Sequence, residues 1–177
     1  MLFLLVLLSV MPEATADGPR PPRIPPCMIV VAYDGPSSSD IACDANDAIL
    51  VKFTVVASCI TSVEEVGVGL DFDGDTGDLT DLKLIDTDTG SVWMGPVTGA
   101  PYLTFNDTQL LERSGTVHLA LTFDPSCDSI TVDDPSPQIS ATIGMDAFAV
   151  YNLRGWPVLN VIPTSDILGN VHTIVVP

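Results

Sequence analysis

The sequence predicts an all-β protein, an antiparallel Ig-like or jelly-roll-like β-sandwich with an extended N-terminal arm. Three observations lead to this prediction. Apolar and polar residues alternate with a period of two in several stretches, as in strands with one buried face. Asp-Gly, Thr-Gly, Asp-Pro and Ser-Pro pairs, which are typical of turns, separate these stretches. After residue 16 no stretch has a convincing helical period, and only 108–113 is compatible with one short helical turn.

The chain begins with an apolar run from Leu2 to Val10, and a small-x-small sequence then ends at Ala16. This pattern is typical of a secretory leader, and the run is too short to span a bilayer core of about 30 Å. We therefore expect residues 1–16 to be a signal peptide, the mature chain to have no stable membrane span, and the protein to be secreted to the cell surface. The leader lacks the usual basic n-region. The alternative for residues 1–16 is a retained hydrophobic tail that packs against a neighbouring subunit.

Residues 17–34 are predicted to form the arm, and 35–177 the β-sandwich domain. The prolines of 17–26 exclude a helix and favour an extended spacer. A strongly β-prone segment follows, which consists of Met28, Ile29, Val30, Val31, Ala32 and Tyr33. The clearest alternating strands are expected over 47–57, 63–73 and 116–124. Shorter strands are expected over 82–86, 91–94, 102–105, 139–143, 147–152, 157–162 and 171–176.

Composition limits the possible functions. The 177 residues carry a net charge of −17, with six Lys+Arg against 23 Asp+Glu, so the chain lacks the basic surface of a nucleic-acid-binding protein. Hydrophobic residues make up 46% and charged residues 16%, which argues against wholesale disorder. A chain of this length forms one domain and buries roughly 68–70% of its unfolded surface.

Four cysteines fit an exported protein, because thiols pair and stay paired outside the cytosol. Three connectivities are possible, and the sequence alone does not choose between them. We favour Cys27–Cys43 together with Cys59–Cys127, because Cys59 and Cys127 each follow the end of an expected strand. A zinc site is a poor alternative, since no C-x-x-C pair is present and the histidines lie far from the cysteines in the sequence.

The densest polar feature is the loop that contains Asp71, Asp73, Asp75 and Asp78. Spaced carboxylates in a loop with glycines suit Ca²⁺, which takes six to eight oxygen ligands. The spacing does not fit an EF-hand, so the alternative is a solvated acidic turn between two strands. Calcium is the one cofactor that the sequence suggests. Two further acidic stretches, at 86–90 and 133–135, are expected to be ordinary loops.

Other candidate sites concern glycans. Asn106 begins the one N-x-[ST] sequon, directly after an expected strand, and is a candidate glycosylation site. Trp93 and Trp156 have the chemistry to stack on surface sugars, although single tryptophans in a sandwich usually pack in the core or at an edge.

No catalytic machinery is evident in the sequence. G-x-S-x-G is absent, and His118 and His172 are each expected on a strand without a nucleophile context. With four glutamates, the chain has few candidates for a general acid, and a pair of glycosidase carboxylates cannot be located among 19 aspartates. We therefore expect a protein that is not an enzyme.

The order of segments from residue 47 to 177 resembles an Ig-like module of exported archaeal and bacterial surface proteins. The segments that carry the resemblance are ILVKFTVVAS, DLKLIDTDTG, YLTFND, LLERSGTVHLALTFDPS, SPQISATIGMDAF and GNVHTIVV. They are loose β patterns without an invariant catalytic residue. The module is similar to subunits of TasA-like biofilm fibres and archaeal bundling pili. The resemblance implies polymerisation by donation of a terminal strand into the sheet of the next subunit. The disulfides and the proline-rich arm are not part of the shared pattern.

Two functions follow as hypotheses. The first is a structural subunit of an extracellular filament, a homopolymer in which 28–33 is the donated strand. The alternative for 28–33 is that this strand pairs within its own sandwich. The second function is a secreted monomeric β-sandwich that binds a carbohydrate or a protein. Because the chain is so acidic, copies would repel each other unless Ca²⁺, salt or glycan spacing offsets the repulsion.

Overall fold

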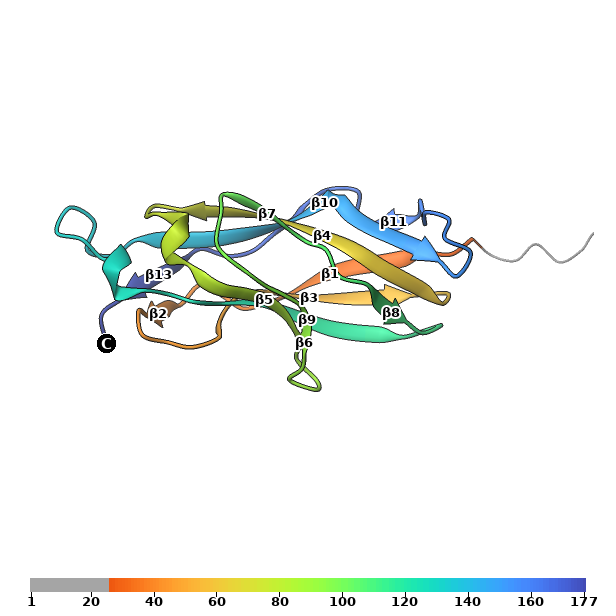
Figure 1. Cartoon of the computed structure of the whole chain (residues 1–177), viewed down its shortest axis with the longest axis horizontal. Helices are drawn as coiled ribbons and strands as arrows, with labels where there is room; N and C mark the ends of the chain where they lie inside the picture. Colours follow the sequence, from red (N-terminus) through yellow and green to blue (C-terminus); the bar gives the residue numbers. More distant parts are fainter. Residues whose placement is uncertain (1–25) are drawn as a thin grey trace, which may run out of the picture.

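The computed structural model describes residues 26–177, so the expected leader and most of the proline-rich spacer lie outside the described part (Figure 1). Two β-sheets pack face to face, and the all-β sandwich is confirmed. One sheet contains, in spatial order, β11 (Val161–Ile162), β1 (Ile29–Gly35), β3 (Ala48–Ala57), β9 (Thr116–Asp124), β5 (Thr80–Asp86) and β6 (Val92–Val97). The other contains β2 (Asp40–Ala42), β13 (His172–Val175), β10 (Gln138–Asn152), β4 (Thr61–Phe72) and β7 (Tyr102–Phe105), with β12 (Ile167–Leu168) on β10 and β8 (Gln109–Leu111) on β4.

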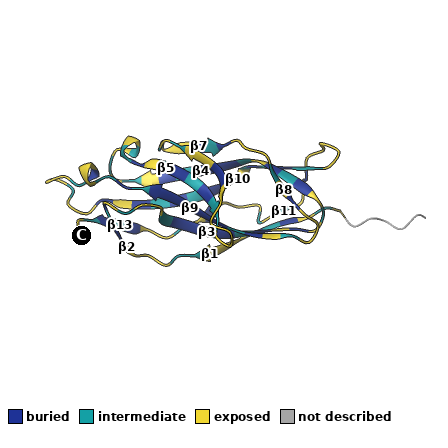
Figure 2. Ribbon diagram, turned by 60° about the horizontal axis from the view of Figure 1, so that its bottom comes forward, coloured by how far each residue is buried: buried dark blue, intermediate teal, exposed yellow. Residues whose placement is uncertain are grey.

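The core lies between the two sheets and is built by the alternating residues that the sequence singled out (Figure 2). In β4, Val66 and Val68 are fully buried, and in β9 Leu119, Leu121 and Phe123 are as well. Most neighbouring strands are antiparallel, as in β3–β9 and β4–β10. The exceptions are β1–β11 and β2–β13, which pair in parallel.

The longest strand is β10, which the sequence divided into two strands at 139–143 and 147–152. Its register against β4 shifts between Gly144 and Phe148, so a bulge interrupts the alternation in the middle of one continuous strand of 15 residues. The segment 108–113 also differs from the prediction, because it contains the short strand β8 rather than a helical turn. Two 3₁₀ turns, η1 (Thr76–Asp78) and η2 (Cys127–Ser129), follow β4 and β9.

The segment predicted to be a donated strand lies inside its own domain. Residues 29–33 form most of β1, which pairs with β3 on one side and with β11 on the other. Ile29 is fully buried, and Val31 is 2% exposed. In this fold 29–33 is an internal strand, the alternative given for this segment, because its backbone pairs on both sides and Ile29 and Val31 are buried. Polymerisation through Met28–Tyr33 stays a prediction that this pairing does not favour.

The sheet edges are also poor sites for adding a strand. Three of the four outermost strands, β11, β2 and β7, have two to four residues. The fourth, β6, contains Pro96, which has no N–H to donate. Short edges and proline are devices that natural sheets use to prevent pairing with another chain. Any association of this protein is therefore expected to use another part of its surface.

Both disulfides differ from the predicted pairing, because the structure joins Cys27 to Cys59 and Cys43 to Cys127. The register of β1 on β3 explains the first, since Ile29 lies opposite Ala57 and continuing that ladder places Cys27 opposite Cys59. For the second disulfide, Cys43 lies between β2 and the start of β3, and Cys127 lies just after the end of β9. The start of β3 pairs with the end of β9, so the two cysteines are brought close together. The Cys27–Cys59 disulfide thus lies at one end of the sandwich, and the Cys43–Cys127 disulfide lies at the other.

Candidate functional site

The acidic loop after β4 does not form a compact set of ligands. Among residues 26–177, the carboxylates of Asp71, Asp73, Asp75 and Asp78 are not among those that cluster closely enough to hold a metal ion. Two of them have other partners: Asp73 accepts a hydrogen bond from the Gln138 backbone, and Asp75 caps η1 by accepting from the Gly77 N–H at 2.9 Å. The geometry of this loop is that of a capped acidic turn.

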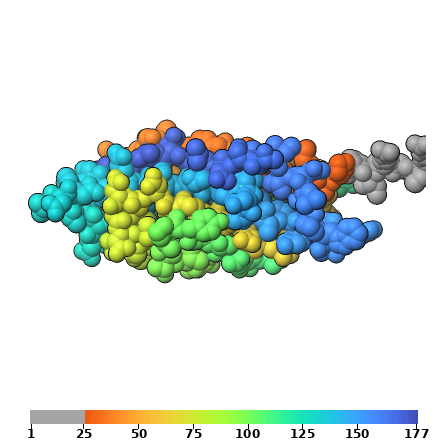
Figure 3. Space-filling model, turned by 90° about the horizontal axis from the view of Figure 1, so that it is seen from above, coloured from red at the N-terminus to blue at the C-terminus, as the bar shows by residue number. Residues whose placement is uncertain are grey.

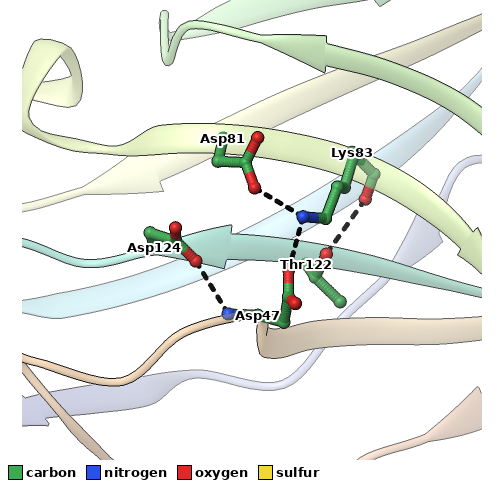
Figure 4. A network of polar contacts seen from close by, with 5 residues as sticks. All are labelled: Asp47, Asp81, Lys83, Thr122 and Asp124. Atoms are coloured by element: carbon green, nitrogen blue, oxygen red, sulfur yellow. Dashed lines mark hydrogen bonds and ion pairs between the residues drawn. The ribbon is translucent and has the colours of Figure 1, made fainter. Parts of the chain in front are cut away.

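Three other carboxylates, from Asp47, Asp81 and Asp124, do converge within 4.8 Å of one another (Figure 4). Lys83 lies among them, with its Nζ atom 2.6 Å from Asp47 and 2.5 Å from Asp81. The Asp47 N–H donates to Asp124 at 2.7 Å, which ties the start of β3 to the end of β9. The cation that this cluster holds is the protein's own ammonium group.

The environment of Lys83 stabilises its charged form. Hydrogen bonds to Asp47 and then to Asp81 raise the pKa of the Lys83 ammonium above its ordinary value, against the smaller opposing effect of burial. The Lys83 side chain is 15% exposed, whereas Asp47 and Asp81 are more open to solvent. A permanently protonated amine is neither a nucleophile nor a base, so the cluster is a structural ion network that connects three strand ends.

The two histidines have separate and non-catalytic surroundings. His172 is fully buried in β13, where its ring nitrogens lie 3.1 Å from Ser39 Oγ and 3.1 Å from the Leu50 carbonyl oxygen. His118 lies on the outer face of β9, 3.8 Å from Asp34. Neither histidine has a serine or cysteine nucleophile arranged as in a hydrolase, because Ser39 bonds a histidine that is closed to solvent and every described cysteine is in a disulfide.

The two tryptophans differ in exposure. Trp93 in β6 is 8% exposed and packs in the core, whereas Trp156 is 67% exposed. Trp156 follows β10 and lies near Cys27, close to where the described chain begins. Asn106, the sequon residue, is exposed directly after β7, which leaves it accessible for a glycan. Of the three candidates for glycan contact, Trp156 and Asn106 are exposed and Trp93 is not.

Trp156 borders a hollow of about 420 Å³ at one end of the sandwich, next to the Cys27–Cys59 disulfide. We name it the polar-end hollow because it lies at one pole of the elongated molecule. It is lined by Cys27, Cys59, Ile60, Asn152, Leu153, Arg154 and Trp156. Ile60, Leu153 and Trp156 are 40%, 68% and 67% exposed. Exposed apolar side chains around a concave surface are typical of an interaction site.

A tight turn positions the hollow's most exposed side chains. The Asn152 side-chain oxygen accepts from the backbone N–H groups of Arg154 and Trp156, at 2.9 and 3.2 Å. The Asn152 N–H also donates to the Trp156 carbonyl, and Gly155 adopts a φ of 72° that closes the turn. Leu153, Arg154 and Trp156 are thus presented on a hydrogen-bonded frame, and little backbone entropy is lost when they bind a partner.

Two other hollows are smaller. One of about 320 Å³ lies beside Trp93 and the β8–β9 turn, and one of about 70 Å³ lies between Asp73 and Gln138. The residues that line these two hollows include no histidine and no cysteine.

Trp156 is a residue that the sequence singles out, whereas Ile60, Leu153 and Arg154 join the hollow without having been predicted. The signal was present in Asn-Leu-Arg-Gly-Trp at 152–156, where large apolar residues occupy a turn that usually consists of small polar ones. Within residues 26–177, no helix has the length and apolar character needed to cross a membrane.

Comparison with known proteins gives no family. No protein-family model matches the sequence, and no curated protein matches it. Among solved structures, the chain is similar to a non-cellulosomal cohesin from the archaeon Archaeoglobus fulgidus, with 12% identity, a TM-score of 0.33, and coverage of 86% of this chain and 91% of that one. It is also similar to a DUF4466 family protein from Parabacteroides merdae, with 10% identity, a TM-score of 0.27, and coverage of 76% and 45%.

Proposed function

We propose that this protein is an exported, non-catalytic β-sandwich that acts by contact with other protein molecules at the cell exterior, as a structural subunit. The observation that carries the proposal is the polar-end hollow, in which a hydrogen-bonded turn holds Leu153 and Trp156 largely exposed beside Ile60. Large rigid aromatic and aliphatic side chains around a concave surface are typical anchors of protein interfaces.

The two disulfides support an extracellular location, since such bonds persist outside the reducing cytosol. The net charge of −17 opposes association between copies at low ionic strength. We therefore expect assembly to require salt or a divalent cation such as Ca²⁺, acting by screening rather than through a dedicated site. A filament, as the resemblance to fibre and pilus subunits implies, is one form that such assembly takes.

The test is sedimentation velocity on the oxidised, exported protein over a range of concentration and salt, with negative-stain microscopy of the same samples. We expect association that rises with concentration and with salt. Trp156→Ser combined with Leu153→Ser should abolish it, because it removes the exposed apolar anchors. Val92→Ser is the matched control, since Val92 is 52% exposed on β6, away from the hollow. A wild-type protein that stays monomeric under all conditions, or an equal effect of the control, would overturn the proposal.

A second candidate function has one observation in its favour. Trp156 is 67% exposed beside Asn152 and Arg154, a combination of an aromatic face with polar groups that suits a carbohydrate. Under this alternative the protein stays monomeric, and its melting temperature rises with one member of a glycan panel. The Trp156→Ser variant should lose that shift.

A further inference from the structure

The two ends of the molecule are opposite in shape. The connection 125–137 precedes β10, and the turn of the polar-end hollow follows it, so 15 residues of extended strand separate them. At about 3.3 Å per residue this is a separation on the order of 50 Å. Figure 3 shows the cyan segment around residue 130 at one extremity and the blue segment around residue 155 at the other. The segment around residue 130 projects at the first end, and the polar-end hollow lies at the second.

The protruding end carries an apolar side chain at its apex. Val132 is 99% exposed, although valine is usually buried. A small turn holds it there, because the Thr131 N–H donates to the Asp134 carbonyl and the Asp134 N–H donates to Thr131 Oγ1, both at 3.0 Å. The Cys43–Cys127 disulfide anchors the same connection to the sandwich. The apex is thus an ordered projection.

The two ends also differ in charge. The loops at the projecting end, 73–79 and 125–137, contain no lysine or arginine. Their acidic residues are Asp73, Asp75, Asp78, Asp128, Asp133 and Asp134. At the other end, Arg154 lines the hollow and has no carboxylate partner among residues 26–177. An acidic projection and a hollow with an unpaired arginine are complementary.

We propose that copies of this chain associate head to tail, with Val132 of one copy in the polar-end hollow of the next and Asp133 beside its Arg154. This inference rests on the proposed function and names the partner as a second copy. A hollow of about 420 Å³ has room for a valine side chain and its turn, since ligand sites span about 300–1,000 Å³. The exposed apolar surfaces of Leu153 and Trp156 would cover Val132 on both sides.

Charge favours this arrangement over a symmetric one. If two hollows faced each other across a two-fold axis, Arg154 would face its own copy, and if two projections met, their aspartates would repel. A contact between two different surfaces leaves one free projection and one free hollow on every pair of copies. Unless the rotation between copies closes a ring, further copies add at these ends and a fibre forms. The fold therefore offers a route to a filament that needs no donated strand.

The experiment is a charge exchange between Asp133 and Arg154, read by sedimentation velocity. Asp133→Arg alone and Arg154→Asp alone should each weaken association by roughly 3- to 10-fold, because each places like charges together. The chain with both substitutions should recover much of the wild-type association. Val132→Ser should weaken it by roughly 10- to 100-fold, since it removes one buried valine contact. Both ends are exposed turns, so these variants should keep the wild-type melting temperature.

Cysteine pairing gives the geometry directly. Molecules with Val132→Cys should cross-link to molecules with Leu153→Cys when mixed, and far less to molecules with Val92→Cys. Cross-linking of Leu153→Cys molecules to one another would instead show a symmetric dimer and overturn the head-to-tail contact. If the Trp156 and Leu153 variants abolish association while Val132→Ser and the charge exchange do nothing, the hollow binds another occupant and only this inference fails. If none of these variants alters association, the proposed function fails as well.

Discussion

Thr61 offers a stability test with an unusual expected sign. It is the first residue of β4, is fully buried, and is paired through its backbone with both β8 and β10. Its Oγ1 is the buried side-chain polar atom in the described residues for which no hydrogen-bond partner is found. A buried hydroxyl without a partner costs about 1–3 kcal/mol relative to water. Thr61→Val keeps the β-branched shape, removes that cost, and should therefore stabilise the protein.

The expected gain is about 1–3 kcal/mol in the free energy of unfolding, or about 2–4 °C of Tm for each kcal/mol at this chain length. The assay is equilibrium unfolding in urea under oxidising conditions, with the midpoint and slope fitted separately. Thr122→Val is the matched control, because Thr122 is also fully buried but its hydroxyl donates to the Lys83 carbonyl at 3.4 Å. That variant should gain nothing. If Thr61→Val is less stable than the wild type, Thr61 Oγ1 has a partner and the reasoning is refuted.

Three further predictions concern polar and covalent links. Lys83→Met should cost about 0.2–1 kcal/mol, because it removes two ion pairs whose carboxylates, on Asp47 and Asp81, stay open to solvent. The folded state raises the pKa of Lys83, so the difference in free energy of unfolding between the wild type and this variant should be constant below about pH 10.4 and should shrink above it. Urea titrations across that pH range measure this difference. A difference that grows above about pH 10.4 contradicts this account. Replacing both cysteines of Cys43–Cys127 by serine should lower the free energy of unfolding by about 0.9 kcal/mol more than the same change at Cys27–Cys59, because the cysteines are separated by 84 residues rather than 32. Equal losses in urea unfolding would count against loop entropy as the cause. His172→Phe should lower Tm by several degrees, because the buried carbonyl of Leu50 loses its partner, and an unchanged Tm by calorimetry would contradict this.

Local patterns in the sequence predicted much of the fold. The alternation over 116–124 has the same bounds as β9, and 47–57 differs from β3 by one residue. Those strands are readable because one periodic stripe of side chains faces the core along their whole length. β10 was divided because its bulge at Gly144–Phe148 breaks the alternation without ending the strand.

The features that depend on strand register were not predictable in the same way. The disulfides were mispaired because Cys27 and Cys59 meet only through the ladder between β1 and β3, and a hydrophobic pattern does not specify which strands are neighbours. The Lys83 network likewise depends on the approach of Asp47 from a distant loop. At the polar-end hollow, Trp156 was noticeable as a residue type, but Ile60 joins it only because β4 and β10 run side by side.

The long pairing of β4 with β10 has a mechanical consequence. β10 runs between the two ends of the molecule, and its ladder with β4 extends from Ile139–Phe72 to Asn152–Thr61. Hydrogen bonds in an antiparallel ladder lie perpendicular to the strands. A tensile force applied between the two ends therefore acts along β10 and loads those bonds in shear, many at once, instead of unzipping them one at a time. Rupture under such a load is governed by the unfolding rate, so the protein is built to resist pulling along its long axis.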